Sequence, residues 1–109
     1  MSFTFSFNAS NSTLYLTGRL LEVVEAESMF KTIDQHIQEK KLTRLYMDLS
    51  DLEYINSSGL SVFLQLLTKM RKNGHDIFLT NISEKVNQLL IVTKLNAVFN
   101  IVKSEPVWR

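Results

Sequence analysis

Hydrophobic and polar positions first alternate along this chain and then change to a helical spacing. Phe3, Phe5 and Phe7 alternate with polar residues, which predicts a strand with aromatic side chains on one face. Residues 8–12 have the composition of a turn, and a second alternating run follows them and ends at Gly18. The two runs together predict a β-hairpin.

Three segments of helical spacing follow, and each is succeeded by a strand-like run. The predicted helices are residues 24–40, residues 58–72 and a third helix that Ser83 caps. The predicted strands are residues 44–49, 76–80 and 97–102, with residues 50–54 as a polar connection. The element order is therefore β-β-α-β-α-β-α-β. This order indicates a small α/β fold: a mixed sheet of four or five strands with helices packed mainly on one face.

The composition indicates one globular domain that spans residues 1–109. Residues 103–109 are predicted to form a tail, and Trp108 in this tail could pack back onto the domain. Of 109 residues, 45% are hydrophobic and 21% are charged, which is ordinary for a domain with a real core. The net charge of +1 argues against binding nucleic acid or an anionic membrane. The N-terminus does not resemble a signal peptide and no apolar run could span a bilayer, so we expect a cytoplasmic protein without membrane insertion.

The start of the second predicted helix holds the main candidates for chemistry. Asn56, Ser57 or Ser58 could simply cap the helix by accepting hydrogen bonds from its first N–H groups. Gly59 lowers helix stability by about 1 kcal/mol relative to alanine, which indicates either a backbone that something must approach closely or tight packing against a neighbouring loop. A phosphate on a serine here would meet free N–H groups and the positive end of the helix dipole. It would change the surface charge without melting the helix.

Other reactive groups give weaker patterns. His36 and His75 lack metal-ligand spacing, and a serine hydrolase would need one of them beside the helix-start hydroxyl. Asp48, Asp51 and Glu53 could hold a magnesium ion, but a turn-forming acid cluster is the simpler interpretation. The chain has no cysteine and no glycine-rich nucleotide motif. We therefore expect no metal and no cofactor.

Three stretches of the chain form a recognisable pattern. The central one is LYMDLSDLEYINSSGLSVFLQLLTKMRKNG, residues 45–74, and it is flanked by LYLTGRLL, residues 14–21, and GHDIFLTNISEKVNQLLIVTKLNAVFNI, residues 74–101. They resemble the core signature and the flanking elements of the STAS domain family, of the bacterial anti-sigma factor antagonist type. The likeness follows the family's element order over nearly the whole chain. It departs where Asn56 replaces the usual aspartate and where Leu21 replaces an acid.

The resemblance implies a regulatory protein, not an enzyme. In this family the first serine of the SSG core is phosphorylated, which falls on Ser57, with Asn56, Ser58 and Gly59 shaping the helix start. The unmodified protein would bind an anti-sigma factor with serine kinase activity, and a PP2C-type phosphatase would reverse the modification. The expected partner surface consists of Gly18, Arg19, Leu21, Glu22, Ser61, Gln65 and Lys69.

Two other functions stay open on the sequence. One is a STAS subunit that binds within a larger signalling or transport complex without phosphorylation. The other is a small hydrolase that uses Ser57. The sequence leaves the oligomeric state open as well.

Overall fold

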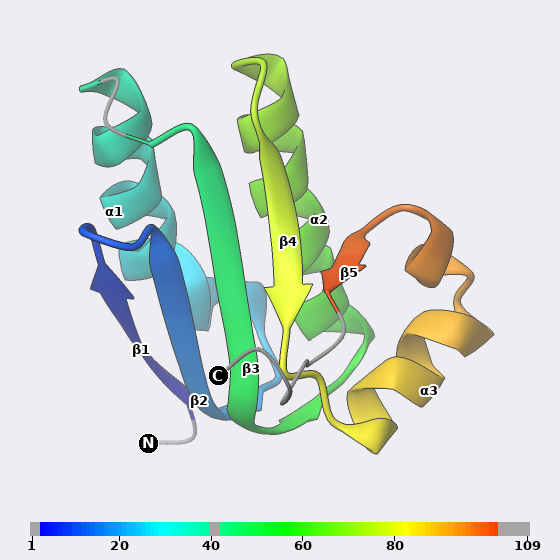
Figure 1. Ribbon diagram of the computed structural model, residues 1–109. Coiled ribbons are helices and arrows are strands. Elements are labelled where there is room, and N and C mark those ends of the chain that lie inside the picture. The colour runs from blue at the N-terminus through cyan, green and yellow to red at the C-terminus, as the bar shows by residue number, and fades with distance from the viewer. Residues whose placement is uncertain (1–2, 40–41, 103–109) are drawn as a thin grey trace, which may run out of the picture.

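The computed structural model describes residues 3–39 and 42–102, which form a five-stranded sheet covered by helices (Figure 1). The strands are β1 (Phe3–Asn8), β2 (Thr13–Leu20), β3 (Arg44–Ile55), β4 (Asp76–Thr80) and β5 (Asn100–Val102), in that order across the sheet. β1 pairs antiparallel with β2, and all later pairs are parallel. The predicted α/β class, opening hairpin and mixed sheet are confirmed. The predicted tail, with Trp108, lies outside the described residues.

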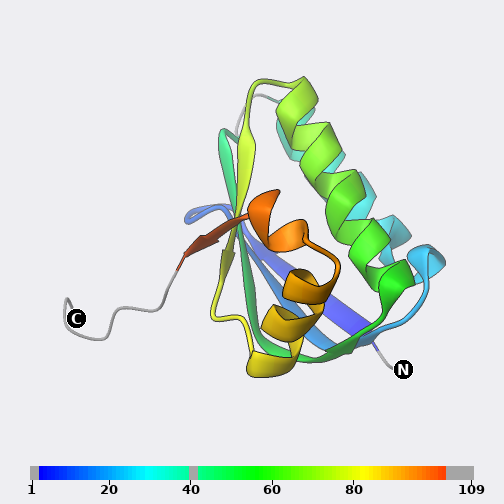
Figure 2. The same cartoon turned by 90° about the vertical axis from the view of Figure 1, so that its right-hand side faces the viewer.

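Each α-helix connects two neighbouring parallel strands. The helices are α1 (Glu27–Gln38), α2 (Ser57–Lys72) and α3 (Glu84–Val92), with short 3-10 turns η1 (Val23–Ala26) and η2 (Leu95–Ala97) beside α1 and α3. Crossovers between parallel strands are right-handed as a rule, and these three step in the same direction across the sheet. All three helices therefore cover one face of the sheet, and no helix of the described residues lies on the other face, which we call the bare face (Figure 2).

The core lies between the sheet and its helices. Its largest fully buried side chains include Leu14, Leu16, Leu45, Met47 and Leu49 from the strands and Met29, Ile33, Phe63, Leu66 and Met70 from the helices. No charged side chain is buried in residues 3–39 and 42–102. No helix in these ranges is both long and apolar enough to cross a membrane. The apolar side chains of the alternating and the helical segments thus pack together in one layer between the sheet and the helices.

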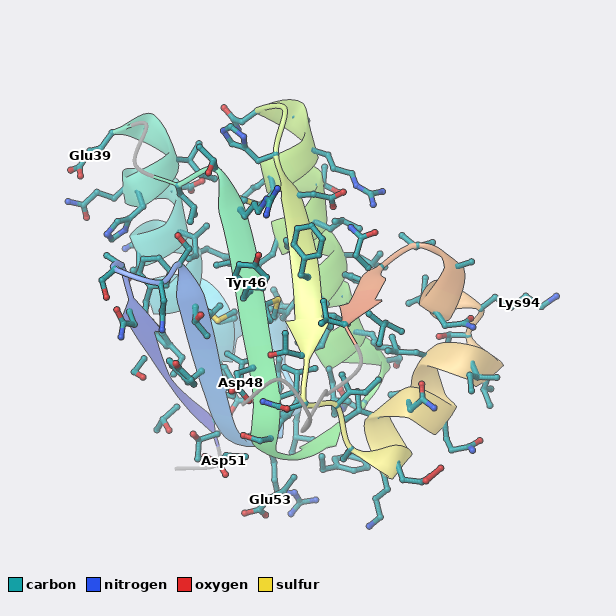
Figure 3. The ribbon with its side chains drawn as sticks, in the orientation of Figure 1. Glu39, Tyr46, Asp48, Asp51, Glu53 and Lys94 are labelled. Carbon is teal, nitrogen blue, oxygen red and sulfur yellow. The ribbon has the colours of Figure 1, made fainter. Side chains whose placement is uncertain are left out.

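The bare face of the sheet carries aromatic and polar side chains. Tyr46 lies on it near the beginning of β3 (Figure 3), and its ring centroid is 5.4 Å from that of Phe78 on β4. The guanidinium of Arg44 lies over the Phe78 ring, 5.9 Å from its centroid.

The predicted connection at residues 50–54 is wrong, because β3 continues without interruption to Ile55. The pairing of β3 with β2 shifts register at two places, and at each of them β3 holds one extra residue. Such β-bulges space the buried positions Leu49, Leu52 and Ile55 three residues apart. The period-two alternation that marks a strand is lost there, so the segment reads as a loop.

The remaining boundaries differ less from the prediction. The first helix begins with the 3-10 turn η1, because the Glu25 carboxylate accepts hydrogen bonds from the Leu21 and Glu22 N–H groups, both at 3.1 Å. The second helix begins at Ser57, one residue early, and ends at Lys72 as predicted. The last strand is shorter than predicted, because η2 occupies the beginning of its segment.

Candidate functional site

The candidate site lies at the carboxyl edge of the parallel strands. The ends of β2, β3 and β4, together with η1 and the starts of α2 and α3, lie at this lower edge of Figure 1. A single residue, Asn56, separates β3 from α2, and Ser57 is the first residue of that helix. Ser57 is exposed, so the structure places the predicted phosphoacceptor on accessible surface.

Asn56 supplies the helix cap by itself. Its Oδ1 accepts a hydrogen bond from Gly59 N at 2.9 Å, and its Nδ2 donates to the Leu21 carbonyl at 3.2 Å. A carboxylate could make the first bond but not the second, so asparagine fits this position better than the family's aspartate. The hydroxyls of Ser57 and Ser58 make no side-chain hydrogen bond within residues 3–39 and 42–102. Capping therefore does not explain Ser57.

Gly59 is buried against Leu20, the last residue of β2, and against Ile55. A Cβ built on it would lie 2.5 Å from the Leu20 carbonyl oxygen and closer still to Ile55 Cγ1. A close approach of the kind that the sequence indicated is present, and it involves both the Leu20 backbone and the Ile55 side chain. The glycine and Asn56 together hold the end of β2 against the first turn of α2.

This contact brings the end of β2, where several of the predicted partner residues lie, beside the first turn of α2. Gly18 has a left-handed backbone, with φ of +93°, and lies where the register with β3 shifts. Arg19 is exposed, and its guanidinium lies 5.5 Å from the centroid of the Tyr54 ring. Leu21 is half-buried and Glu22 is exposed at the entrance to η1.

The predicted partner residues of α2 share one surface of that helix. Ser61, Gln65 and Lys69 line an open groove of about 320 Å³, together with Leu64 and Thr68, which the sequence analysis did not include. Gln65 Nε2 donates to Ser61 Oγ at 3.3 Å. Lys69 Nζ forms an ion pair with Asp34 of α1 at 3.0 Å, so its charge is already engaged.

A larger and mainly apolar groove, of about 540 Å³, lies on the other side of Ser57. One wall holds Tyr54, Ile55 and Ser57, and the opposite wall is formed by α3. We call this space the α3 groove. Sequence reasoning missed it because its walls are far apart along the chain. The local sequence gave one indication of it: Leu89 and Val92 are apolar residues three positions apart on α3 that do not belong to its buried pair, Val86 and Leu90.

Both histidines lie at the opposite edge of the sheet from Ser57. α2 has 16 residues, so it spans about 24 Å between Ser57 and the turn that leads to His75. His36 is in the last turn of α1, where its ring packs 4.8 Å from that of Phe7 and its Nδ1 lies 2.8 Å from the Thr32 carbonyl. Neither imidazole can reach Ser57, so the Ser-His-Asp hydrolase considered above lacks its histidine base.

The acidic residues of β3 are spread along the strand. Figure 3 shows Asp48, Asp51 and Glu53 one after another toward its carboxyl end. Asp48 accepts hydrogen bonds from Ser50 N at 3.0 Å and from Asn81 Nδ2 at 3.1 Å. Within the described ranges no group of three or more His, Cys, Asp or Glu residues could hold a metal ion. Asp48 therefore organises the strand and the loop after β4.

Known proteins are similar to this chain in sequence and in fold. The anti-sigma-B factor antagonist of Bacillus subtilis (strain 168) is 36% identical over 58 residues, which are 52% of this chain and 53% of that protein. The chain thus spans about half the length of the curated relatives it matches, with 53% of each covered.

Two solved structures of SpoIIAA have the same fold. The unphosphorylated anti-sigma factor antagonist matches with a TM-score of 0.68 at 15% identity, covering 95% of this chain and 90% of that one. The phosphorylated form, described as a Bacillus cell fate determinant, also gives 0.68, at 16% identity and 96% and 93% coverage. The model of the STAS domain family matches residues 7–106. The chain therefore belongs to the STAS domain family.

Proposed function

We propose that this protein is a bacterial anti-sigma factor antagonist, switched by reversible phosphorylation of Ser57. One observation carries the proposal: an exposed serine begins a 16-residue helix whose cap is already supplied by Asn56. The Bacillus subtilis relative is named as an antagonist of an anti-sigma factor, and SpoIIAA has a phosphorylated form of the same fold. The partner is an anti-sigma factor with serine kinase activity, in the cytoplasm, and a PP2C-type phosphatase reverses the modification.

The phosphorylation step needs only the hydroxyl from this chain. Ser57 Oγ forms a bond to the γ-phosphorus of kinase-bound ATP, the bond to ADP breaks, and the hydroxyl proton leaves to a base of the kinase. The phosphatase then hydrolyses the phosphate ester, which returns the hydroxyl and inorganic phosphate. The protein is substrate and ligand in this cycle, and the nucleotide and magnesium belong to the kinase.

The position of Ser57 separates the effect on the fold from the effect on binding. A phosphate there adds about −1.5 to −2 charges near the positive end of the α2 dipole, which tolerates negative charge. A partner surface fitted to the neutral hydroxyl would instead bury an unpaired charge, at a cost on the order of 3–5 kcal/mol. The domain keeps its shape while its complex dissociates.

The binding surface extends from Ser57 in two directions. Gly18, Arg19, Leu21 and Glu22 flank it on the side of β2, where Asn56 ties the two segments together. Ser61, Gln65 and Lys69 continue it along α2.

The test is phosphorylation in vitro. The purified chain is incubated with magnesium, ATP and, one at a time, each purified anti-sigma factor kinase encoded by the same genome. We expect one of them to bind the chain and to add one phosphoryl group at Ser57, located by peptide mass spectrometry. Ser57→Ala should abolish the modification, whereas Ser58→Ala, the matched control at the neighbouring exposed serine, should retain it.

Ser57→Asp should lose the complex and keep the urea unfolding midpoint of the wild type. A kinase that binds equally well with and without ATP, leaving Ser57 unmodified, would contradict the switch. That result would favour the phosphorylation-independent interaction subunit.

A further inference from the structure

Helix α3 presents apolar side chains on two sides. Val86 and Leu90 are buried in the core, and the more exposed Leu89 and Val92 line the α3 groove beside Val86. Val92 is 76% exposed, which leaves about three quarters of its surface in contact with water. The helix is thus more apolar than its packing in this domain requires.

The opposite wall of the α3 groove is continuous with the phosphoacceptor. Tyr54, 45% exposed, and Ile55 end β3, and Ser57 follows them on the same wall. Figures 1 and 2 both place α3 next to this passage from β3 into α2. Glu84 and Lys85 also line the groove, so charged groups stand beside its mainly apolar lining. Pockets that hold the anchor residue of a protein interface have this character.

We infer that the α3 groove is a docking site for the anti-sigma factor kinase and receives an apolar side chain of that partner. The inference rests on the proposed function. A kinase that transfers a phosphoryl group to Ser57 must bring its ATP within about 3–3.5 Å of the Oγ. Because Ser57 is itself part of the groove wall, the kinase surface next to that ATP covers the groove. An apolar side chain there removes Leu89 and Val92 from water.

Two neighbouring residues of α3 provide a matched test. Val92 lines the groove and Ile91 does not, although Ile91 is also 46% exposed. Val92→Glu should raise the Kd for the purified kinase about tenfold or more, and Ile91→Glu should change it less than about twofold. Phosphorylation of Ser57 at a kinase concentration below the Kd should slow in the same ratio. Circular dichroism should show both variants folded, since neither side chain is buried in the core.

A photo-cross-linker identifies the occupant directly. Benzoylphenylalanine at position 92 should cross-link to an apolar segment of the kinase, and the same group at position 91 should not. A cross-link at position 92 to a second copy of the chain, or a small apolar molecule found on the purified protein by native mass spectrometry, would overturn the inference.

The binding data distinguish a failure of the docking site from a failure of the proposed function. Wild type that binds and is phosphorylated, with both glutamate variants equal to it, refutes the groove as a docking site and leaves the proposed function intact. Wild type that binds none of the kinases refutes both.

Discussion

Gly59 has no room for a larger side chain. Alanine is the better helix former by about 1 kcal/mol, yet its Cβ would lie 2.5 Å from the Leu20 carbonyl oxygen, which is backbone and cannot rotate away. We expect Gly59→Ala to lower the free energy of unfolding by about 1–3 kcal/mol in urea titrations. Ser58→Ala, in the same turn but exposed, should stay within about 0.5 kcal/mol of wild type. Equal stability of Gly59→Ala and wild type would mean that the end of β2 moves aside easily.

Asp76, at the start of β4, is expected to make the free energy of unfolding depend on pH. Burial raises the pKa of Asp76, but hydrogen bonds from the Ile77 N–H and the Asn100 amide, and the nearby Arg71 guanidinium, outweigh it and hold the pKa below its ordinary value. A carboxyl with a lowered folded-state pKa stabilises the fold above its unfolded pKa, about 3.9, and this contribution is lost as the pH falls through the folded value.

Asp76→Asn should therefore be less stable than wild type at pH 7, and the difference should shrink as the pH falls below about 4. Urea titrations across this range measure it. Asp51→Asn, at an exposed position of β3, is the comparison. A difference that stays constant with pH would show that Asp76 acts through packing and not through its charge.

At the scale of elements, α1 and α2 are joined by the Lys69–Asp34 ion pair. The side chains are 35% and 44% exposed, so we expect a coupling energy below about 1 kcal/mol that falls with added salt. A double-mutant cycle of Lys69→Met and Asp34→Asn, measured by urea unfolding at low and high salt, gives this number. A coupling that salt leaves unchanged would mean that the pair is shielded from solvent. If it is weak, a partner carboxylate can take Lys69 from Asp34 at little cost.

The sequence predicted elements wherever a regular period continued through them. α2, β4 and the Ser83 cap of α3 show this, since the Ser83 side chain accepts a hydrogen bond from Val86 N at 3.2 Å. The end of β3 was missed because two extra residues break its alternation, and only pairing with β2 reveals it as a strand.

The candidate site likewise has a part that the local sequence predicts and a part that it does not. Ser57 and Gly59 lie in one short motif, so local sequence identifies them. The donation from Asn56 to Leu21 and the α3 groove join segments that are distant along the chain, and no local pattern encodes them.

At the scale of the whole molecule, phosphorylation should reverse the sign of the net charge. The chain carries +1 at pH 7 and has an isoelectric point of about 8.0. One phosphate brings the charge to between about −0.5 and −1, so the modified form should focus below pH 7. Isoelectric focusing after incubation with kinase and ATP separates the two forms. Ser57→Ala should stay at the unmodified position, and a shift in that variant would assign the phosphate to another residue.

The bare face of the sheet has a practical consequence for measuring partner binding by this protein in solution. The chain contains no cysteine, so Ser6→Cys, at an exposed position of β1, would give it a single thiol. A dye attached there would sit on the edge strand, with β2 between it and β3, the strand that leads to Ser57. Fluorescence anisotropy of that dye would then register the arrival and departure of a partner through the tumbling of the whole particle, with the surface under study left unlabelled.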